Sequence, residues 1–363
     1  MADKLSGSRG CLLGLAVGDA MGIAVDKKSL AEIYEDYGPN GLLGYDLTNG
    51  NAEVSSYTQI AAYTGNGILL GVARGKQDLL PYITVSLREW ARNQNFHRDP
   101  EVSRCWVAKP KCLRLHNNRD ARMLDALRPQ TLGSPDAPTN LNNTPGVLTE
   151  AIPLALYAYG HQIGASDLAT LAVRSAALTH GYPETFLSVA VLAVSLLEIL
   201  SDPDAPVVDH ILKGVRAVQA QYGIAFATAA DRLAARIGRA ISMALDDKFD
   251  IRVEMERLEC NTAADCLAGS VYACATSLGD FDTALITAVN HSGASACVGA
   301  VTGALMGAKL GADALPDFYL ESLVCAPELR VLSEDLLQSK VTSGLFDDAW
   351  DHKYIQGLPP EKF

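Results

Sequence analysis

Three acidic side chains within the first 53 residues could serve as acid or base: Asp19, Asp26 and Glu53. Hydrolysis of an N- or O-glycosidic bond through an oxocarbenium-like state can proceed with positioned carboxyl groups and no metal. Each residue also has a simpler interpretation. Asp19 lies in the sequence GDAMG, where a carboxylate commonly accepts hydrogen bonds from backbone, and we interpret Asp26 as a solvated loop acid.

A second group of polar side chains surrounds a loop of small residues near the end of the chain. Ser292-Gly293-Ala294-Ser295 precedes an expected helix, whose first N–H groups could bind an anion such as a diphosphate. We favour a helix cap by Ser292 or Ser295, since capping serines are common. His291 and Cys297 could form a pair, but a buried inert cysteine is the simpler interpretation.

A third candidate, His180, lies between Thr179 and Gly181 after a helical segment. Packing inside the core and contact with a ligand both remain open for it, whereas metal binding is not expected. The chain has no G-x-S-x-G motif for a serine nucleophile. Its eight cysteines form no C-x-x-C pair, so the spacing does not indicate a zinc site.

Two series of glycines four residues apart indicate how these side chains are positioned. One series is Gly14, Gly18 and Gly22, and the other comprises Gly299, Gly303, Gly307 and Gly311. On a helix this spacing forms a stripe that another backbone can approach closely. Each glycine costs about 1 kcal/mol relative to alanine in a helix, so we expect the two helices to pack tightly together.

Apolar residues recur with helical periodicity along most of the chain. Helices are expected at about 8–23, 28–36, 57–74, 79–93, 119–127, 147–160, 166–178, 183–201, 206–221, 225–244, 262–276, 280–291 and 295–310. Residues 94–118 and 128–146 are rich in loop-forming residues and are expected to be long loops. The sequence therefore predicts an all-α protein.

Composition excludes several classes of protein. A net charge of −12 argues against a nucleic-acid-binding surface. The longest apolar run, 187–197, is too short to span a membrane and predicts a buried helix. Scattered cysteines without an N-terminal apolar segment favour reduced thiols and a cytoplasmic location.

Several motifs occur in order along the chain. They are Gly10–Asp26 (GCLLGLAVGDAMGIAVD), Ser55–Ile60 (SSYTQI), Thr179–Gly181 (THG) and Asn290–Gly311, with a weaker segment at Thr144–Pro153. In these motifs the chain resembles the ADP-ribosylglycohydrolase family over about residues 9–315. The resemblance implies a compact all-α bundle around a cleft, hydrolysis of ADP-ribosyl bonds, ADP-ribose or an ADP-ribosylated protein as ligand, and a pair of Mg²⁺ ions.

The chain departs from this family at the metal site. Family members hold the ions with a Thr-Asp-Asp and an Asp-x-Asp-Thr segment, which correspond here to Ser55, Ser56, Tyr57 and to Ala294, Ala296, Cys297. All four carboxylates are replaced, and Mg²⁺ is usually held by at least one or two carboxylates. The sequence therefore predicts that the metal pair is absent and that no cofactor is bound. The ring of Tyr57 could fill the volume of the ions.

The resemblance also implies which residues surround the cleft. They are Ser55, Ser56, Tyr57, Thr58, His180, His291, Ser292, Gly293, Ser295 and Cys297. Asp19 and Asp26 remain the candidate catalytic residues, and Glu150 stands where the family has arginine, which reverses a charge.

Three functions stay open. The first is a pseudoenzyme that binds ADP-ribose, a related nucleotide or a protein partner. The second is a metal-independent glycosidic hydrolase, and the third is an assembly protein with a vestigial cleft. We expect one domain over 1–363, with a C-terminal extension at about 330–363 that could form an oligomer contact.

Overall fold

The computed structural model describes residues 2–95, 103–246, 250–342 and 349–355. Within these ranges the regular elements are helices, and extended pairing is limited to two isolated bridges. The prediction of an all-α fold is therefore confirmed.

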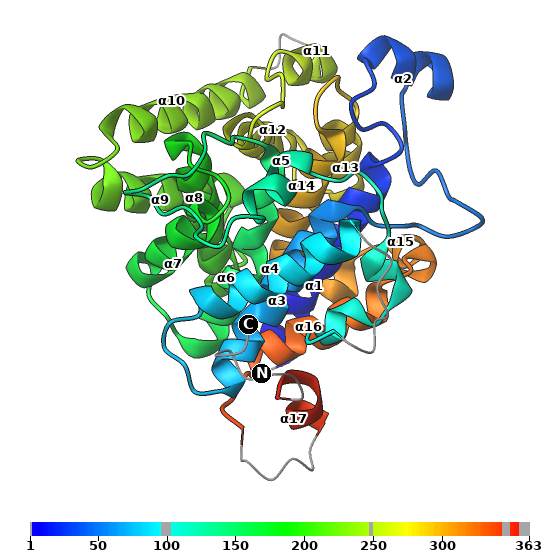
Figure 1. Cartoon of the computed structure of the whole chain (residues 1–363). Helices are drawn as coiled ribbons and strands as arrows, with labels where there is room; N and C mark the ends of the chain where they lie inside the picture. Colours follow the sequence, from blue (N-terminus) through cyan, green and yellow to red (C-terminus); the bar gives the residue numbers. More distant parts are fainter. Residues whose placement is uncertain (1, 96–102, 247–249, 343–348, 356–363) are drawn as a thin grey trace.

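The α-helices follow one another along the whole chain (Figure 1). Their bounds are α1 Ala2–Gly22, α2 Leu30–Tyr37, α3 Ser56–Ala73, α4 Leu80–Asn95, α5 Ala121–Ala126, α6 Ala151–His161, α7 Ala165–Ala177, α8 Pro183–Ser201, α9 Val207–Tyr222, α10 Ala227–Ala244, α11 Ile251–Glu256, α12 Ala263–Thr276, α13 Phe281–Val289, α14 Ser295–Leu310, α15 Asp317–Ser322, α16 Ala326–Leu337 and α17 Ala349–Tyr354. Short 3₁₀ helices include η4, Pro145–Glu150, directly before α6.

Helices α1 and α14 lie against each other in the middle of the molecule (Figure 1). A Cβ atom added to Gly303 would lie 2.6 Å from the carbonyl carbon of Gly14, and one added to Gly307 would lie 2.6 Å from that of Gly10. A Cβ on Gly18 would lie 3.0 Å from the backbone nitrogen of Ala300. The two backbones are thus in direct contact, as the glycine spacing predicts, and Gly10 extends the stripe by one turn.

The remaining helices enclose this pair. Helices α3, α6, α8 and α16 contact α1, and α8, α12 and α13 contact α14. Helix α8 is long and apolar enough to cross a membrane, but 89 % of its most apolar 18-residue stretch is buried inside the protein. It is therefore a core helix of the kind found in soluble proteins, in agreement with the expectation for residues 187–197.

The beginning of the expected C-terminal extension belongs to the packed core. Helix α16 contacts α1, α3 and α6, and its Glu334 pairs with Arg9 of α1. A Cβ on Gly160 would lie 2.8 Å from the carbonyl carbon of Leu337. Residues 343–348 and 356–363 of that segment lie outside the described residues.

Candidate active site

Asp19 holds the beginning of helix α3. Its side chain is fully buried and accepts four hydrogen bonds, from the N–H groups of Ser55 and Thr58 at 2.9 and 3.1 Å and from their hydroxyls at 2.5 and 2.6 Å. Burial raises the pKa of Asp19 to about 6, although these hydrogen bonds act in the opposite direction. Every oxygen of this carboxylate is engaged, which supports a structural role for Asp19.

Asp26 is buried, so its interpretation as a solvated loop acid is wrong. Only 5 % of its side chain is exposed. One oxygen accepts a hydrogen bond from the N–H of Ala296 at 3.0 Å, and the other accepts one from the side-chain amide of Asn118 at 2.9 Å. Burial is the main cause of its raised pKa. The sequence could not show this, because both partners lie far from Asp26 along the chain.

Asp26 also replaces the serine cap that we expected at helix α14. The residue before this helix is Ala294, which provides no side-chain cap. The Ser295 hydroxyl donates to the carbonyl of His291 at 3.0 Å, and the Ser292 hydroxyl accepts a hydrogen bond from the N–H of Leu30 at 2.8 Å. The N–H of Ala296 in the first turn of α14 therefore donates to the carboxylate of Asp26. The prediction of a serine cap at this helix is wrong.

The loop before α14 anchors the segment that follows α1. The carbonyl of Gly293 accepts a hydrogen bond from the N–H of Lys27 at 3.1 Å. The side-chain amide of Asn290 accepts from the N–H of Leu42 at 2.8 Å and donates to its carbonyl at 2.9 Å. In this loop the side chains of Asn290, Ser292 and Ser295 are engaged within the protein, whereas the Nε2 atom of His291 has no hydrogen-bond partner among the described residues.

A pocket of about 350 Å³ opens beside these contacts. Tyr57, at the beginning of α3, lines it although only 5 % of the residue is exposed. Its cationic lining residues are Lys27, Arg119 and Arg122, and Asp120 is the acidic one. Burial raises the pKa of the Tyr57 phenol well above its ordinary value, so Tyr57 presents a neutral hydroxyl.

His180 contacts this pocket indirectly through Thr144. The Thr144 hydroxyl lies 2.9 Å from the Nε2 atom of His180 and donates to the carboxylate of Asp120 at 2.6 Å. The Nδ1 atom of His180 lies 2.8 Å from the hydroxyl of Thr179. His180 is fully buried, and burial lowers its pKa to about 4. The imidazole is therefore neutral at physiological pH and positions Thr144.

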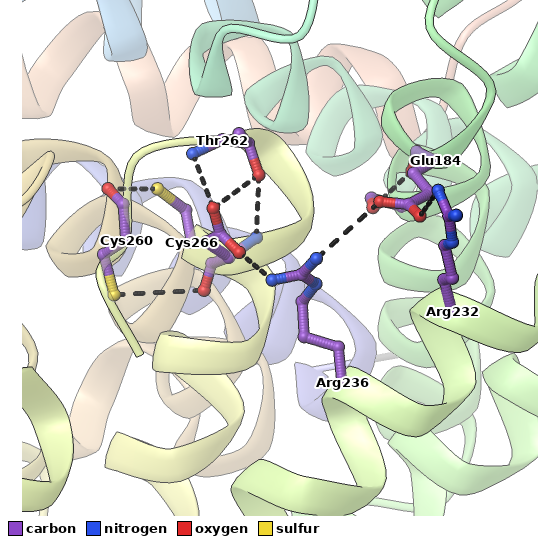
Figure 2. Close-up of polar contacts among 8 residues, drawn as sticks. Glu184, Arg232, Arg236, Cys260, Thr262 and Cys266 are labelled. Atoms are coloured by element: carbon purple, nitrogen blue, oxygen red, sulfur yellow. Dashed lines mark hydrogen bonds and ion pairs between the residues drawn. The ribbon is translucent and has the colours of Figure 1, made fainter. Parts of the chain in front are cut away.

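A network of polar contacts joins α8, α10 and α12 next to Asn261, a lining residue of the pocket (Figure 2). Arg236 of α10 pairs with Asp265 of α12 and, at 3.8 Å, with Glu184 of α8. Asp265 in turn accepts from the N–H and the hydroxyl of Thr262 at 3.1 and 2.7 Å. This capping box fixes the loop that carries the lining residue Asn261.

His291 and Cys297 do not form a catalytic pair. The Nδ1 atom of His291 accepts from the N–H of Gly293 at 2.9 Å, whereas the Cys297 thiol donates to the carbonyl of Pro145 at 3.5 Å. Burial lowers the pKa of His291 to about 4. Neither side chain lines the pocket.

The ADP-ribosylglycohydrolase family model matches residues 1–345. The chain belongs to the ADP-ribosylglycohydrolase family. A solved structure described as an ADP-ribosylglycohydrolase-related protein complex shares the fold, with a TM-score of 0.57 and 23 % identity over 94 % of this chain and 100 % of that one. No curated protein shows significant similarity to the chain.

The Mg²⁺ pair that the ADP-ribosylglycohydrolase family implies does not fit the residues present here. The Ser55 hydroxyl donates to Asp19, and the Ser56 hydroxyl donates to the carbonyl of Asn118. Across the described ranges, no three His, Cys, Asp or Glu side chains form a group that could hold a metal ion. Mg²⁺ requires oxygen ligands, which usually include carboxylates. The two segments that hold the ions in the family contain no carboxylate in this chain.

Sequence reasoning missed Asp120 as the acidic lining residue of the pocket. Its carboxylate accepts from the N–H of Met123 at 3.0 Å, because Asp120 is the N-cap of α5. The sequence prediction begins this helix at residue 119 and so places Asp120 inside it, although an aspartate at the beginning of a helix is a detectable capping signal. Its proximity to Thr144 and His180 depends on tertiary packing and has no sequence signature.

Glu150 lies in the core, outside the pocket lining. One carboxylate oxygen accepts from the hydroxyl of Ser175 at 2.6 Å, and the other has no hydrogen-bond partner within the described residues. Burial raises the pKa of Glu150 to about 7. The folded protein therefore carries a poorly compensated carboxylate above that pH.

Replacing Glu150 with glutamine should stabilise the protein at pH 8 and have much less effect at pH 5. The folded-state pKa of Glu150 lies above the unfolded value, so its contribution to stability is lost as pH rises from about 4.5 to 7, by roughly 3 kcal/mol in total. Urea unfolding of Glu150→Gln at both pH values measures the difference. Exposed Glu35→Gln on α2 is the control, and an equal effect of Glu150→Gln at the two pH values would contradict the prediction.

Proposed function

We propose that this protein is a pseudoenzyme of the ADP-ribosylglycohydrolase family that binds ADP-ribose or a related nucleotide in the Tyr57 pocket. The observation that carries the proposal is the state of the two metal-binding segments. They contain no carboxylate, and the hydroxyls of Ser55 and Ser56 are bound to protein partners. These contacts stabilise α3 and its surroundings without the ions that the family uses.

The chemistry of the pocket supports a ligand with a diphosphate. Lys27, Arg119 and Arg122 provide positive charge in a chain whose net charge is −12. Guanidinium groups match phosphate geometry well, and Pro145 and Ala294 add apolar lining beside them. The volume of about 350 Å³ is within the usual range for small-molecule sites.

The proposal includes a cytoplasmic location and function without a metal cofactor. All eight cysteines are free thiols in the fold, which suits a reducing compartment. An ADP-ribosylated protein is the form of partner that fits best, because it presents the same diphosphate on a larger surface.

Metal-independent glycosidic hydrolysis is the second candidate function. It would use Asp120, the carboxylate that lines the pocket, because Asp19, Asp26 and Glu53 do not line it. A single positioned carboxylate can act as a general acid or base. Hydrolysis by the native protein that disappears in a folded Asp120→Asn variant would favour this candidate over the pseudoenzyme.

A thermal-shift titration with ADP-ribose, with and without Mg²⁺, tests the proposal. At 100 times its Kd the ligand should stabilise the protein by about 2.7 kcal/mol, and we expect the same shift in EDTA. Arg122→Gln should weaken this response, whereas Arg216→Gln on the exposed side of α9 should not. Hydrolysis of ADP-ribosyl substrates that depends on Mg²⁺ would contradict the proposal. No shift with any nucleotide would favour an assembly role.

A further inference from the structure

A second, larger pocket lies between α4 and the end of α5. Its volume is about 720 Å³, and none of its lining residues belongs to the Tyr57 pocket. Arg88 and Arg92 line it from α4, one helical turn apart, and Arg128 lines it from the residues after α5. The pocket is thus a separate site with its own chemistry.

The charge of this pocket is opposite to that of the chain. Among the residues that the structure describes, three arginines line it and no aspartate or glutamate does, although the protein carries a net charge of −12. Burial, and after it the positive charge of Arg92, lowers the pKa of Arg88. Asp125 pairs with Arg128 at 3.1 Å, but both side chains are about 70 % exposed and such pairs contribute little.

Arg88 fixes the geometry of the pocket. Its guanidinium donates to the carbonyls of Leu127, Pro129 and Gln130 at 3.3, 2.6 and 2.9 Å. These hydrogen bonds hold the segment after α5 against α4. The position of Arg128 relative to Arg92 is therefore set by a fixed element of the fold.

The floor of the pocket is apolar. Ala91, Leu124 and Leu127 line it, and each is less than 10 % exposed. Small-molecule sites typically combine such an apolar surface with a few polar groups that orient the ligand.

Helix-end electrostatics explain part of this arrangement. Arg92 lies in the last turn of α4, and Arg128 follows the end of α5, where a positive charge is favourable. That effect places one arginine at each helix end. It does not explain why Arg92 and Arg128 line one pocket together with a third arginine and an apolar floor.

We propose that this pocket binds a small phosphorylated molecule. Arg92 and Arg128 would hold its phosphate or pyrophosphate group through charge-assisted hydrogen bonds. The apolar or planar part of the ligand would rest on Ala91, Leu124 and Leu127. This site is independent of the function proposed for the Tyr57 pocket.

Calorimetric titration of the full-length protein with inorganic pyrophosphate tests the proposal. Arg92→Gln and Arg128→Gln remove one charge each and should weaken binding about tenfold, equivalent to ~1.4 kcal/mol. Arg88 is left unchanged because it holds the segment after α5. Arg239→Gln, at an exposed position of α10, is the matched control and should leave the affinity within about twofold.

Two further measurements identify the site and the ligand class. Arg122→Gln alters only the Tyr57 pocket, so pyrophosphate binding that persists in this variant and is weakened by Arg92→Gln and Arg128→Gln supports a separate site. Adenosine monophosphate should bind more tightly than inorganic phosphate if the apolar floor contributes. Equal weakening by Arg92→Gln and Arg239→Gln, no binding of pyrophosphate, or equal affinity for malonate and pyrophosphate would overturn the proposal.

Discussion

Gly303→Ala should destabilise the protein severely. The added methyl group would overlap the backbone carbonyl of Gly14, with its Cβ 2.6 Å from the carbonyl carbon. Backbone atoms cannot rotate away as a side chain can, so α1 and α14 would have to separate along their contact. Overpacking in a core usually costs about 1–3 kcal/mol, and we expect at least ~4 kcal/mol here, because separation also opens neighbouring layers.

Urea unfolding followed by circular dichroism measures this loss. The matched control is Gly238→Ala on α10, an exposed helical glycine whose added Cβ meets no atom within 4 Å. Alanine there should stabilise the protein by about 0.5–1 kcal/mol, since glycine is the poorer helix former. A Gly303→Ala variant as stable as the native protein would show that the two helices tolerate a wider spacing.

Asp19→Ala should cost about 4 kcal/mol and loosen the beginning of α3. The substitution leaves four buried donors, two N–H groups and two hydroxyls, without their acceptor. A single unsatisfied buried group costs about 1–3 kcal/mol, and partial relaxation makes the four costs less than additive.

An exposed cap provides the comparison for Asp19. Asp280 is the N-cap of α13 and accepts from the N–H of Thr283 at 2.7 Å. Asp280→Ala should cost only about 1 kcal/mol. If Asp19→Ala were no more costly than Asp280→Ala, Asp19 would not hold α3, and a catalytic role for this carboxylate would regain support.

Local signals determined how well each helix could be predicted. The bounds of α8 and α14 agree with the sequence prediction, because Pro183 marks the beginning of α8 and Gly311 follows the end of α14. Helices α11 and α15 were missed because six residues give too little periodicity. Helix α16 was missed because the family motifs end before it, although twelve residues of suitable pattern were present.

The candidate site was less predictable than the fold. Sequence motifs identified the residues around α3 and the loop before α14, but they could not show which polar groups satisfy one another. The carboxylate of Asp26 accepts a hydrogen bond from the N–H of Ala296, about 270 residues away. This contact buries Asp26 and caps the first turn of α14. Three-dimensional packing therefore determines the roles of Asp19, Asp26 and Asp120, which residue type alone left open.

The contact between α1 and α14 has a consequence for how the chain acquires its structure. Gly14 and Gly303 are nearly 290 residues apart, so closing this contact carries a large entropic cost, and such topologies fold slowly. During synthesis α3, α6 and α8 can contact α1 early, but the glycine face of α1 stays without α14 until residues 295–310 have been made. Newly made chains should therefore depend on chaperones that shield α1 while its partner is being translated.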